Sequence, residues 1–300
     1  MTKILIIGAT GNIGSLTAAA LAARYPEKSL RLTSSRASGC AQLREQYPAA
    51  EIMCADWYDL TSLTAAMQGV EKVFVVTPDF VTDELVATNN MIGAAKAAPG
   101  LLQMLRMITM PPGLTAADLE PEVLATRCGA NLSVVAKPLL DASGLPVTYI
   151  NVASWIMFNL PWFLAEEVRA TRRLAMPAKS NTPRLWLSEA DIAEAAAKIL
   201  ADDAALHLGK EYMITGSRRY AFQDVADMLS EVLGENVSYA DDDAAFRRTM
   251  GENFNTIMTY FKHETRDYAH LMPTDTFRQL VGRAPVELSD YLQTNKAMFI

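Results

Sequence analysis

The chain has 300 residues, half of them apolar and 20% charged, with a formal net charge of −7. This length and apolar content are ample for a hydrophobic core and for one large domain or one and a half. The acidic balance leaves no basic face of the kind that nucleic acids require, so we expect no nucleic-acid partner.

The cysteine, histidine and hydropathy patterns indicate whether the protein has disulfides, metal sites or membrane spans. The three cysteines, Cys40, Cys54 and Cys128, show no C-x-x-C spacing, so we expect reduced thiols of a cytoplasmic protein rather than a disulfide or metal site. None of the three histidines lies in a ligand pair, and no metal is expected. No apolar run has the length of a membrane span, and no signal peptide precedes the first strand, so we expect no membrane partner. An oligomer is compatible with the sequence.

The first half alternates short apolar runs with helical stretches, which is typical of a parallel sheet with crossover helices. The runs are continuous rather than alternating, as expected for strands buried on both faces. The predicted helices cover residues 12–24, 61–67 and 82–97. The predicted strands cover residues 4–7, 30–33, 51–54, 73–76, 104–108 and 147–152.

The second half is less regular. Residues 155–163 are aromatic and interrupted by Pro161, and residues 175–183 read as a loop. Ser188 and Asp191 form a capping-box signature that predicts a helix. Residues 212–216 then predict a strand that returns to the sheet edge, and a helix ends at Gly234. The remainder, 241–300, is mixed and mostly helical. We therefore expect an α/β protein whose nucleotide domain is intertwined with a smaller cap.

Three glycines, Gly8, Gly11 and Gly14, join the first strand to the first helix and point to a nucleotide site. A glycine lets the chain turn tightly, and backbone without Cβ atoms can approach a diphosphate. The helix that follows offers free N–H groups and the positive end of its dipole to that anion. Thr10, Asn12 and Ile13 lie inside the same turn, and we expect them to line the cofactor site. An ordinary strand–helix turn is the alternative.

The residues at the end of the predicted second strand indicate whether the cofactor is NAD or NADP. In dinucleotide-binding proteins an acidic residue there holds the ribose of NAD, whereas an arginine accommodates the 2′-phosphate of NADP. This chain has Ser34, Ser35 and Arg36 and no acid, which favours NADPH. Asp56, after the third strand, is expected near the adenine; a cap for the next segment explains it equally well.

Thr77 and Pro78 follow the fourth strand, where the chain must clear the nicotinamide half of the cofactor. We expect both residues to line the cofactor site. A simple loop role is the alternative.

The segment Gly8–Gly14, G-A-T-G-N-I-G, resembles the signature of the NmrA-like family of atypical short-chain dehydrogenase/reductases. The resemblance covers roughly residues 3–240. It implies a Rossmann doubly wound parallel sheet with a smaller, mostly helical C-terminal substrate domain, and it implies binding of NADP(H). The implied boundaries are 1–153, with returns at about 186–216, for the cofactor domain, and 154–185 with 217–300 for the substrate domain. Further matching segments are Ser34–Arg36, Ala55–Asp56, Gly69–Pro78, Ser143–Thr148, Asp191–Ala193 and Gly209–Gly216.

Hydride transfer leaves negative charge on the acceptor, which then needs a proton or a hydrogen-bond donor. The Tyr-x-x-x-Lys pair of ordinary short-chain dehydrogenases is missing before Ser143. Ser133 occupies the position where the family often has Lys or His, and Lys137 follows one helical turn later. We expect Lys137 and Thr109 to orient the reacting end; a surface lysine and a strand-end hydroxyl are the alternatives.

Trp155, Phe158 and Asn159 are the expected substrate contacts. Aromatic faces suit flat, apolar acceptors because they supply contact area with few hydrogen bonds. Core packing is the alternative for the aromatic residues.

Two functions fit these residues. The first is an NADPH-dependent reductase of a small aromatic or conjugated substrate such as a quinone, enone or imine, because such acceptors need little general acid. The second is an NADP(H)-sensing regulator that binds a protein partner without turnover. A nucleotide-sugar epimerase is a weaker reading, since it needs the missing Tyr–Lys pair.

Overall fold

The computed structural model describes residues 3–177 and 180–300, and the chain folds into two compact units. The segments that form each unit alternate along the chain, so each unit is built from three separate pieces. Unit 1 consists of Met1–Asp118, Arg127–Asn151 and Ile192–Met213. Unit 2 consists of Leu119–Thr126, Val152–Asp191 and Ile214–Ile300.

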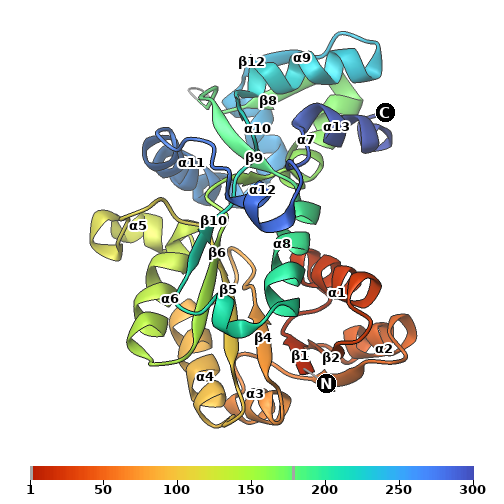
Figure 1. Ribbon diagram of the computed structural model, residues 1–300. Coiled ribbons are helices and arrows are strands. Elements are labelled where there is room, and N and C mark those ends of the chain that lie inside the picture. Colours follow the sequence, from red (N-terminus) through yellow and green to blue (C-terminus); the bar gives the residue numbers. More distant parts are fainter. Residues whose placement is uncertain (1–2, 178–179) are drawn as a thin grey trace. The chain divides into compact units, whose positions relative to one another are not determined.

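Unit 1 is built on a seven-stranded parallel sheet with the strand order β10-β6-β5-β4-β1-β2-β3 (Figure 1). β1 pairs with both β2 and β4, so the order of the chain reverses between β1 and β4. The predicted doubly wound sheet is confirmed, including the strand that returns beside β6. The strands are β1 (Lys3–Ile6), β2 (Ser29–Ser34), β3 (Glu51–Cys54), β4 (Lys72–Val75), β5 (Gln103–Ile108), β6 (Val147–Asn151) and β10 (Glu211–Met213).

Apolar side chains explain why these runs form central strands. Ile4, Leu5 and Ile6 of β1 are completely buried, because helices cover both faces of the sheet. The helices of unit 1 are α1 (Asn12–Arg24), α2 (Ala37–Gln46), α3 (Leu60–Met67), α4 (Glu84–Lys96) and α6 (Ala130–Ala142), and α8 (Glu189–Ala201) enters it from Ile192.

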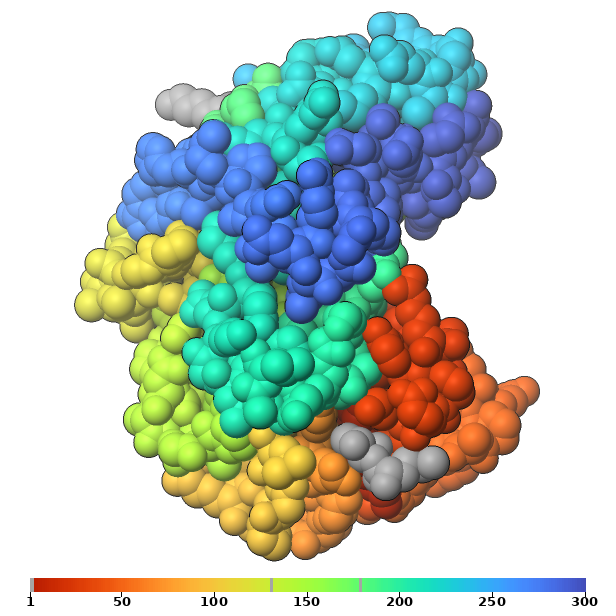
Figure 2. All heavy atoms as spheres, viewed as in Figure 1, coloured from red at the N-terminus to blue at the C-terminus, as the bar shows by residue number. Residues whose placement is uncertain are grey.

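The helices lie on opposite faces because the chain leaves β1 in two directions. Right-handed crossovers place α1 on one face and α4 and α6 on the other. α3 packs against α4, and α4 packs against α6. Arg24 of α1 forms an ion pair with Glu194 of α8, so these two helices are neighbours, which is visible as adjoining red and teal atoms in Figure 2.

Unit 2 contains two small sheets and several helices. Its three-stranded sheet has the order β11-β9-β7, and β12 pairs with β8 in the other. Within residues 3–177 and 180–300, no helix combines the length and the apolar character of a membrane span. The strands are β7 (Trp155–Ile156), β8 (Arg173–Met176), β9 (Arg184–Leu187), β11 (Arg219–Tyr220) and β12 (Ser238–Asp241). The helices are α5 (Pro121–Leu124), α7 (Asn159–Thr171), α9 (Phe222–Leu233), α10 (Asp243–Met250), α11 (Phe254–Tyr268), α12 (Thr276–Val281) and α13 (Leu288–Thr294), with short 3-10 turns between some of them.

Unit 2 confirms some local predictions and corrects others. The helix that ends at Gly234 is α9, and Gly234 has the left-handed φ of 73° that ends helices. The predicted loop 175–183 was wrong at its start, because Ala175 and Met176 belong to β8. Pro161 does not interrupt the aromatic segment: it lies in the first turn of α7, where a missing N–H costs nothing.

The expectation of reduced cysteines was also wrong for two of the three residues. Cys40 of α2 and Cys54 at the end of β3 form a disulfide, with their Cα atoms 6.1 Å apart. The spacing of 14 residues between them has no metal or redox signature, and only the packing of α2 beside β3 brings them together. Cys128 is buried and does not take part in this disulfide.

Candidate functional site

The candidate site lies at the carboxyl edge of the sheet in unit 1, where the parallel strands end together. Ligands of doubly wound sheets bind outside this edge, at the point where the strand order reverses. In this chain that point lies between β1 and β4. The loops after β1, β2, β3, β4 and β5 all carry residues that the sequence predicts to be functional.

The glycine turn after β1 is a tight, backbone-lined cradle. Gly8 has a φ of +72°, a conformation that favours glycine, and Gly11 N–H donates to the Gly8 carbonyl over 2.9 Å. A Cβ atom on Gly14 would lie 2.5 Å from the Gly8 oxygen, a separation that Cβ atoms in proteins essentially never show. Glycine at position 14 therefore lets α1 pack directly against the turn.

The start of α1 suits an anion. Gly11 is the N-cap residue and has no side chain to bond the first N–H groups of the helix. Gly11 and Asn12 are exposed, whereas Ile13 is buried and fixes the helix against the sheet. Free N–H groups and the positive end of the helix dipole therefore face outward, and this arrangement fits the diphosphate of a dinucleotide.

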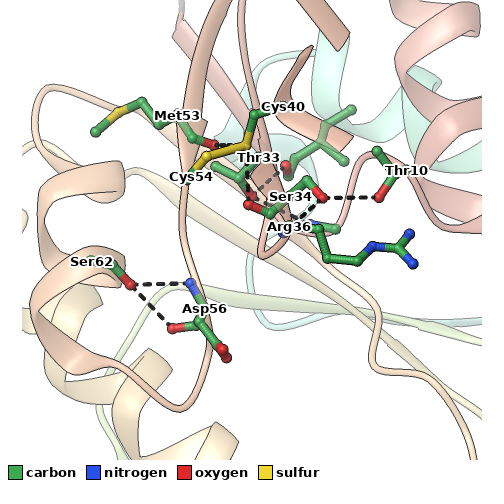
Figure 3. The surroundings of a disulfide bond; sticks show 11 residues. Thr10, Thr33, Ser34, Arg36, Cys40, Met53, Cys54, Asp56 and Ser62 are labelled. Carbon is green, nitrogen blue, oxygen red and sulfur yellow. Dashed lines mark hydrogen bonds between the residues drawn. A yellow bond between two sulfur atoms is a disulfide. The ribbon is translucent and has the colours of Figure 1, made fainter. Parts of the chain in front are cut away.

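Ser34, Ser35 and Arg36, which were predicted to bind the ribose end of the adenosine, follow one another at the end of β2. Figure 3 labels Ser34 and Arg36. Ser34 is buried: its Oγ lies 3.3 Å from Thr10 Oγ1 and accepts the Arg36 N–H over 3.3 Å. Ser35 and Arg36 are exposed, and Arg36 is the N-cap residue of α2. In Figure 3 the side chain of Arg36 extends away from the Cys40–Cys54 disulfide, and Thr10 and Ser34 lie near it, joined by their dashed contact.

The loop after β3 places Asp56 at the same edge. Asp56 Oδ1 accepts the Tyr58 N–H over 2.9 Å, so the side chain does cap the following segment. Asp59, not Asp56, is the N-cap residue of α3. Trp57 is a neighbour that we did not predict: its ring would lie 3.6 Å from a Cβ atom on Gly8. An aromatic ring directly after a predicted adenine-binding strand is the signal that could have indicated it.

Thr77 after β4 is held by a buried ion pair. Arg106 Nη2 of β5 lies 2.7 Å from Glu84 Oε1 of α4, and only 2% of each side chain is exposed. Thr77 Oγ1 accepts a hydrogen bond from Arg106 over 2.8 Å and donates one to Glu84 over 2.9 Å. Pro78 is exposed, and its carbonyl accepts the Thr82 hydroxyl. The ion pair thus fixes the strand end on which we expect the nicotinamide half of the cofactor.

This ion pair was not predicted from the sequence, although one signal for it was present. Arg106 interrupts the otherwise mostly apolar strand Gln103–Ile108. A charged residue in a central strand of a parallel sheet requires a buried partner of opposite charge. The partner, Glu84, could not be identified from sequence because it lies 22 residues away at the start of α4.

Thr109 follows β5 and is joined to α6 through Ser133. The Ser133 Oγ accepts the Thr109 N–H over 2.9 Å, and Ser133 is 3% exposed. The hydroxyl of Ser133 therefore lies at the end of β5, close to the backbone of Thr109. Among the two positions that we considered on α6, Ser133 is the one that the structure brings to Thr109.

Lys137 lies one helical turn further along α6, where it meets carboxylates. Its Nζ is 2.9 Å from Asp141 Oδ2 and 3.7 Å from Glu211 Oε2. Its Nζ also lies 4.6 Å from the centre of the Tyr149 ring. The structure thus does not bring Lys137 to Thr109, because one turn of helix carries it along α6 and two acidic side chains hold its charge.

The contact of Lys137 with Tyr149 is not a catalytic Tyr–Lys pair. The Tyr149 hydroxyl donates to Asp141 over 2.8 Å. Burial, together with this neighbouring carboxylate, raises the pKa of Tyr149 far above that of a free phenol. In a catalytic pair the lysine lowers the phenol pKa, so this arrangement has the opposite effect.

Asn151 at the end of β6 is a structural connector. Its amide donates to the Met110 carbonyl over 2.9 Å and accepts the Met110 N–H over 3.1 Å. The same amide donates to Glu211 of β10 over 2.7 Å. Asn151 is completely buried, so it holds the segment after Thr109 against two strands of the sheet.

The three predicted substrate residues belong to unit 2. Trp155 is a core residue there: it is 7% exposed, packs against Trp186, Phe222 and other rings, and donates its indole N–H to Glu264 over 3.1 Å. Phe158 is 38% exposed, and Asn159 begins α7. The structure therefore supports the core alternative for Trp155, while Phe158 and Asn159 remain predicted substrate contacts.

The chain is similar in sequence and in fold to several known proteins. The quinone oxidoreductase 2 of Escherichia coli is 27% identical over 83% of this chain and 82% of its own length. The crystal structure of NmrA, a negative transcriptional regulator in complex with NADP, superposes with a TM-score of 0.76 at 18% identity, covering 97% of this chain and 94% of that one. At 18% identity, the similarity to NmrA is one of fold alone.

The doubly wound sheet and the glycine turn at its switch point define a dinucleotide-binding protein of the Rossmann class. The model of the NmrA-like family matches residues 1–104. The NAD(P)H azoreductase of Xenophilus azovorans is 30% identical over 79% of this chain and 76% of its own length. The chain belongs to the NmrA-like family of atypical short-chain dehydrogenase/reductases.

Proposed function

We propose that this protein is an NADPH-dependent reductase of a small, flat, conjugated acceptor such as a quinone or an azo compound. The observation that carries the proposal is Arg36, an exposed cation at the end of β2, beside a glycine turn that opens α1. A guanidinium at this place matches a 2′-phosphate, and no carboxylate occupies the end of β2 to select NAD. The names of the azoreductase and quinone oxidoreductase relatives support the substrate class.

Each part of the proposed cofactor site has a separate task. The glycine turn and the start of α1 bind the diphosphate, and Arg36 with Ser35 binds the 2′-phosphate. Asp56 faces the adenosine, and Thr77, fixed by Glu84 and Arg106, orients the nicotinamide half. We propose that the cofactor contacts are Gly8, Thr10, Gly11, Asn12, Ile13, Gly14, Ser34, Ser35, Arg36, Asp56, Thr77 and Pro78, with Thr10, Ile13 and Ser34 acting mainly through packing.

The missing Tyr–Lys pair limits the chemistry. Bound NADPH supplies a hydride, and the acceptor must also take up one proton to form, for example, a hydroquinone. Conjugated acceptors spread the added charge over several atoms, so they need less help from a general acid than an isolated ketone does. The Thr109 hydroxyl at the end of β5 is the group that we propose to donate a hydrogen bond to the reacting end, and the buried Ser133 holds the Thr109 backbone in place.

An NADPH oxidation assay tests the proposal. We expect purified protein to oxidise NADPH in the presence of a quinone or an azo dye, and to use simple aliphatic ketones poorly. Initial rates are followed by absorbance across a panel of quinones, azo dyes, enones and iminium compounds. Saturable NADPH binding without turnover of any member of the panel would contradict the reductase proposal.

Substitutions of Ser133 and Lys137 distinguish the roles of these two residues of α6. We expect Ser133→Ala to lower kcat roughly tenfold, because the Thr109 N–H loses its acceptor and the proposed Thr109 donor is no longer held in position. Lys137→Ala removes the partly exposed ion pairs of Lys137 with Asp141 and Glu211, and kcat should stay within about twofold of the native value. The measurement is the steady-state rate at saturating NADPH and quinone. A large loss of kcat in Lys137→Ala with no loss in Ser133→Ala would show instead that Lys137 acts at the reacting end.

An NADP(H)-sensing regulator is the second candidate function. The missing Tyr–Lys pair and the fold likeness to the regulator NmrA favour it. In that case the protein should capture a protein partner whose affinity depends on the ratio of NADP⁺ to NADPH. Affinity purification with either nucleotide present distinguishes the candidates, because a reductase consumes NADPH with a small acceptor and needs no protein partner.

A further inference from the structure

The Cys40–Cys54 disulfide lies directly beside the proposed 2′-phosphate site (Figure 3). Cys40 lies in the first turns of α2, and its N–H donates to the Arg36 carbonyl over 3.0 Å. Cys54 is the last residue of β3. The disulfide therefore attaches the start of α2, which carries Arg36, to the neighbouring strand of the sheet.

The surroundings of the two sulfur atoms also accommodate the dithiol. Cys40 Sγ lies 3.4 Å from the Ser34 carbonyl oxygen and 3.7 Å from that of Met53. A reduced Cys40 thiol can donate its hydrogen to either oxygen without a large movement. The Cys40 thiol of the reduced state therefore has hydrogen-bond acceptors already in place.

The two sulfur atoms differ in access. Cys40 is completely buried, whereas Cys54 is an exposed residue. An external thiolate can therefore reach the Cys54 sulfur, and exposed disulfides are the ones that exchange most readily. The Cys40 sulfur is then the leaving group of the exchange.

We infer that Cys40 and Cys54 are a reversible redox site that controls the affinity for NADPH through Arg36. An external dithiol donates two electrons: its first sulfur bonds to Cys54 and releases the Cys40 thiolate, and its second sulfur then displaces Cys54. The protein gains two thiols, and the external dithiol becomes a disulfide. This inference rests on the proposed function, because it uses the 2′-phosphate contact of Arg36.

The expected effect is selective for the phosphorylated cofactor. With the disulfide intact, the first turn of α2 is held in place before NADPH binds, so less conformational freedom is lost on binding. After reduction, we expect the Kd for NADPH to rise roughly three- to tenfold, because Arg36 must be ordered by the ligand. The Kd for NADH, which lacks the 2′-phosphate, should stay within about twofold.

The experiment compares oxidised and dithiothreitol-reduced protein in fluorescence titrations with NADPH and NADH. Thiol titration and intact mass establish the redox state of each sample, and reoxidation with diamide should restore the tighter binding. Cys54→Ser should bind NADPH like the reduced protein and lose its response to dithiothreitol. Cys128→Ser is the matched control, and it should respond as the native chain does.

The outcomes separate the two proposals. Equal NADPH affinity in both redox states, equal shifts for NADPH and NADH, or three titratable thiols after diamide treatment would each overturn the redox inference and leave the reductase proposal standing. No saturable NADPH binding in either state would overturn the proposed function, and the redox inference with it. If Cys54→Ser does not fold, the titrations of the native chain in its two states still decide.

Discussion

Gly14→Ala is expected to destabilise the protein and to disrupt its cofactor site together. The added Cβ atom would lie 2.5 Å from the Gly8 carbonyl oxygen, 3.2 Å from the Gly8 carbonyl carbon and 3.3 Å from Ala9 Cα. All three atoms belong to the backbone, so no side chain can rotate away, and either α1 or the glycine turn must move. Overpacking of this kind costs about 1–3 kcal/mol in the free energy of unfolding.

The affinity for NADPH should fall with the stability. Movement of the turn displaces the N–H groups that we propose to bind the diphosphate, and a loss of about 1–3 kcal/mol corresponds to a roughly five- to hundredfold rise in Kd. Thermal unfolding and fluorescence titration measure the two effects on the same sample. Native NADPH affinity in a folded Gly14→Ala protein would contradict the position that we assign to the diphosphate.

Gly100→Ala is the matched control for this substitution. Gly100 lies between α4 and β5, and a Cβ atom there would meet nothing within 4 Å. Its φ lies outside the left-handed range, so alanine can adopt the native backbone conformation. We expect Gly100→Ala to keep both the melting temperature and the NADPH affinity of the native chain.

Arg36→Ala is expected to weaken NADPH binding much more than NADH binding. A hydrogen bond to a charged group contributes about 1.5–3 kcal/mol, so the Kd for NADPH should rise roughly ten- to hundredfold. NADH has no 2′-phosphate, and its Kd should change less than about threefold. Arg36→Lys should be intermediate, because lysine keeps the charge but not the planar fork of two donors.

A second arginine on the same helix controls for the loss of charge. Arg44 is exposed in the last turn of α2, so Arg44→Ala removes the same charge at the opposite end of the helix. Both variants are titrated with NADPH and NADH at two salt concentrations, because general electrostatic attraction is screened by salt. Equal effects of Arg36→Ala on the two cofactors would remove the 2′-phosphate assignment.

Local patterns predicted the sheet well. Ile4–Ile7 and Val73–Val76 were recognisable because a strand covered on both faces must be continuously apolar, and the structure places both runs in the centre of the sheet. The bounds of α1 were predicted from the glycine turn that precedes it. β8 and β9 were missed, because these four-residue runs flank a segment rich in Pro and Ser that is typical of a loop.

Contacts between distant side chains could not be predicted in this way. Lys137 is a plausible cation by its position in the chain, yet Asp141 and Glu211 hold its charge in the structure. Trp155 lies next to the predicted pocket residues in sequence, but the rings of Trp186 and Phe222 enclose it in the core of unit 2. The partners in both cases come from other elements of the chain.

The amino-acid sequence by itself determined the parallel sheet, the glycine turn and the arginine at the end of β2, since each follows from the conformational preferences of neighbouring residues. Only the tertiary structure decided that Arg106 pairs with Glu84 and that Cys40 bonds to Cys54. The physical reason is that ion pairs and disulfides depend on distances of a few ångström between separate elements. Those distances are set by how helices pack on strands, and no local spacing encodes them.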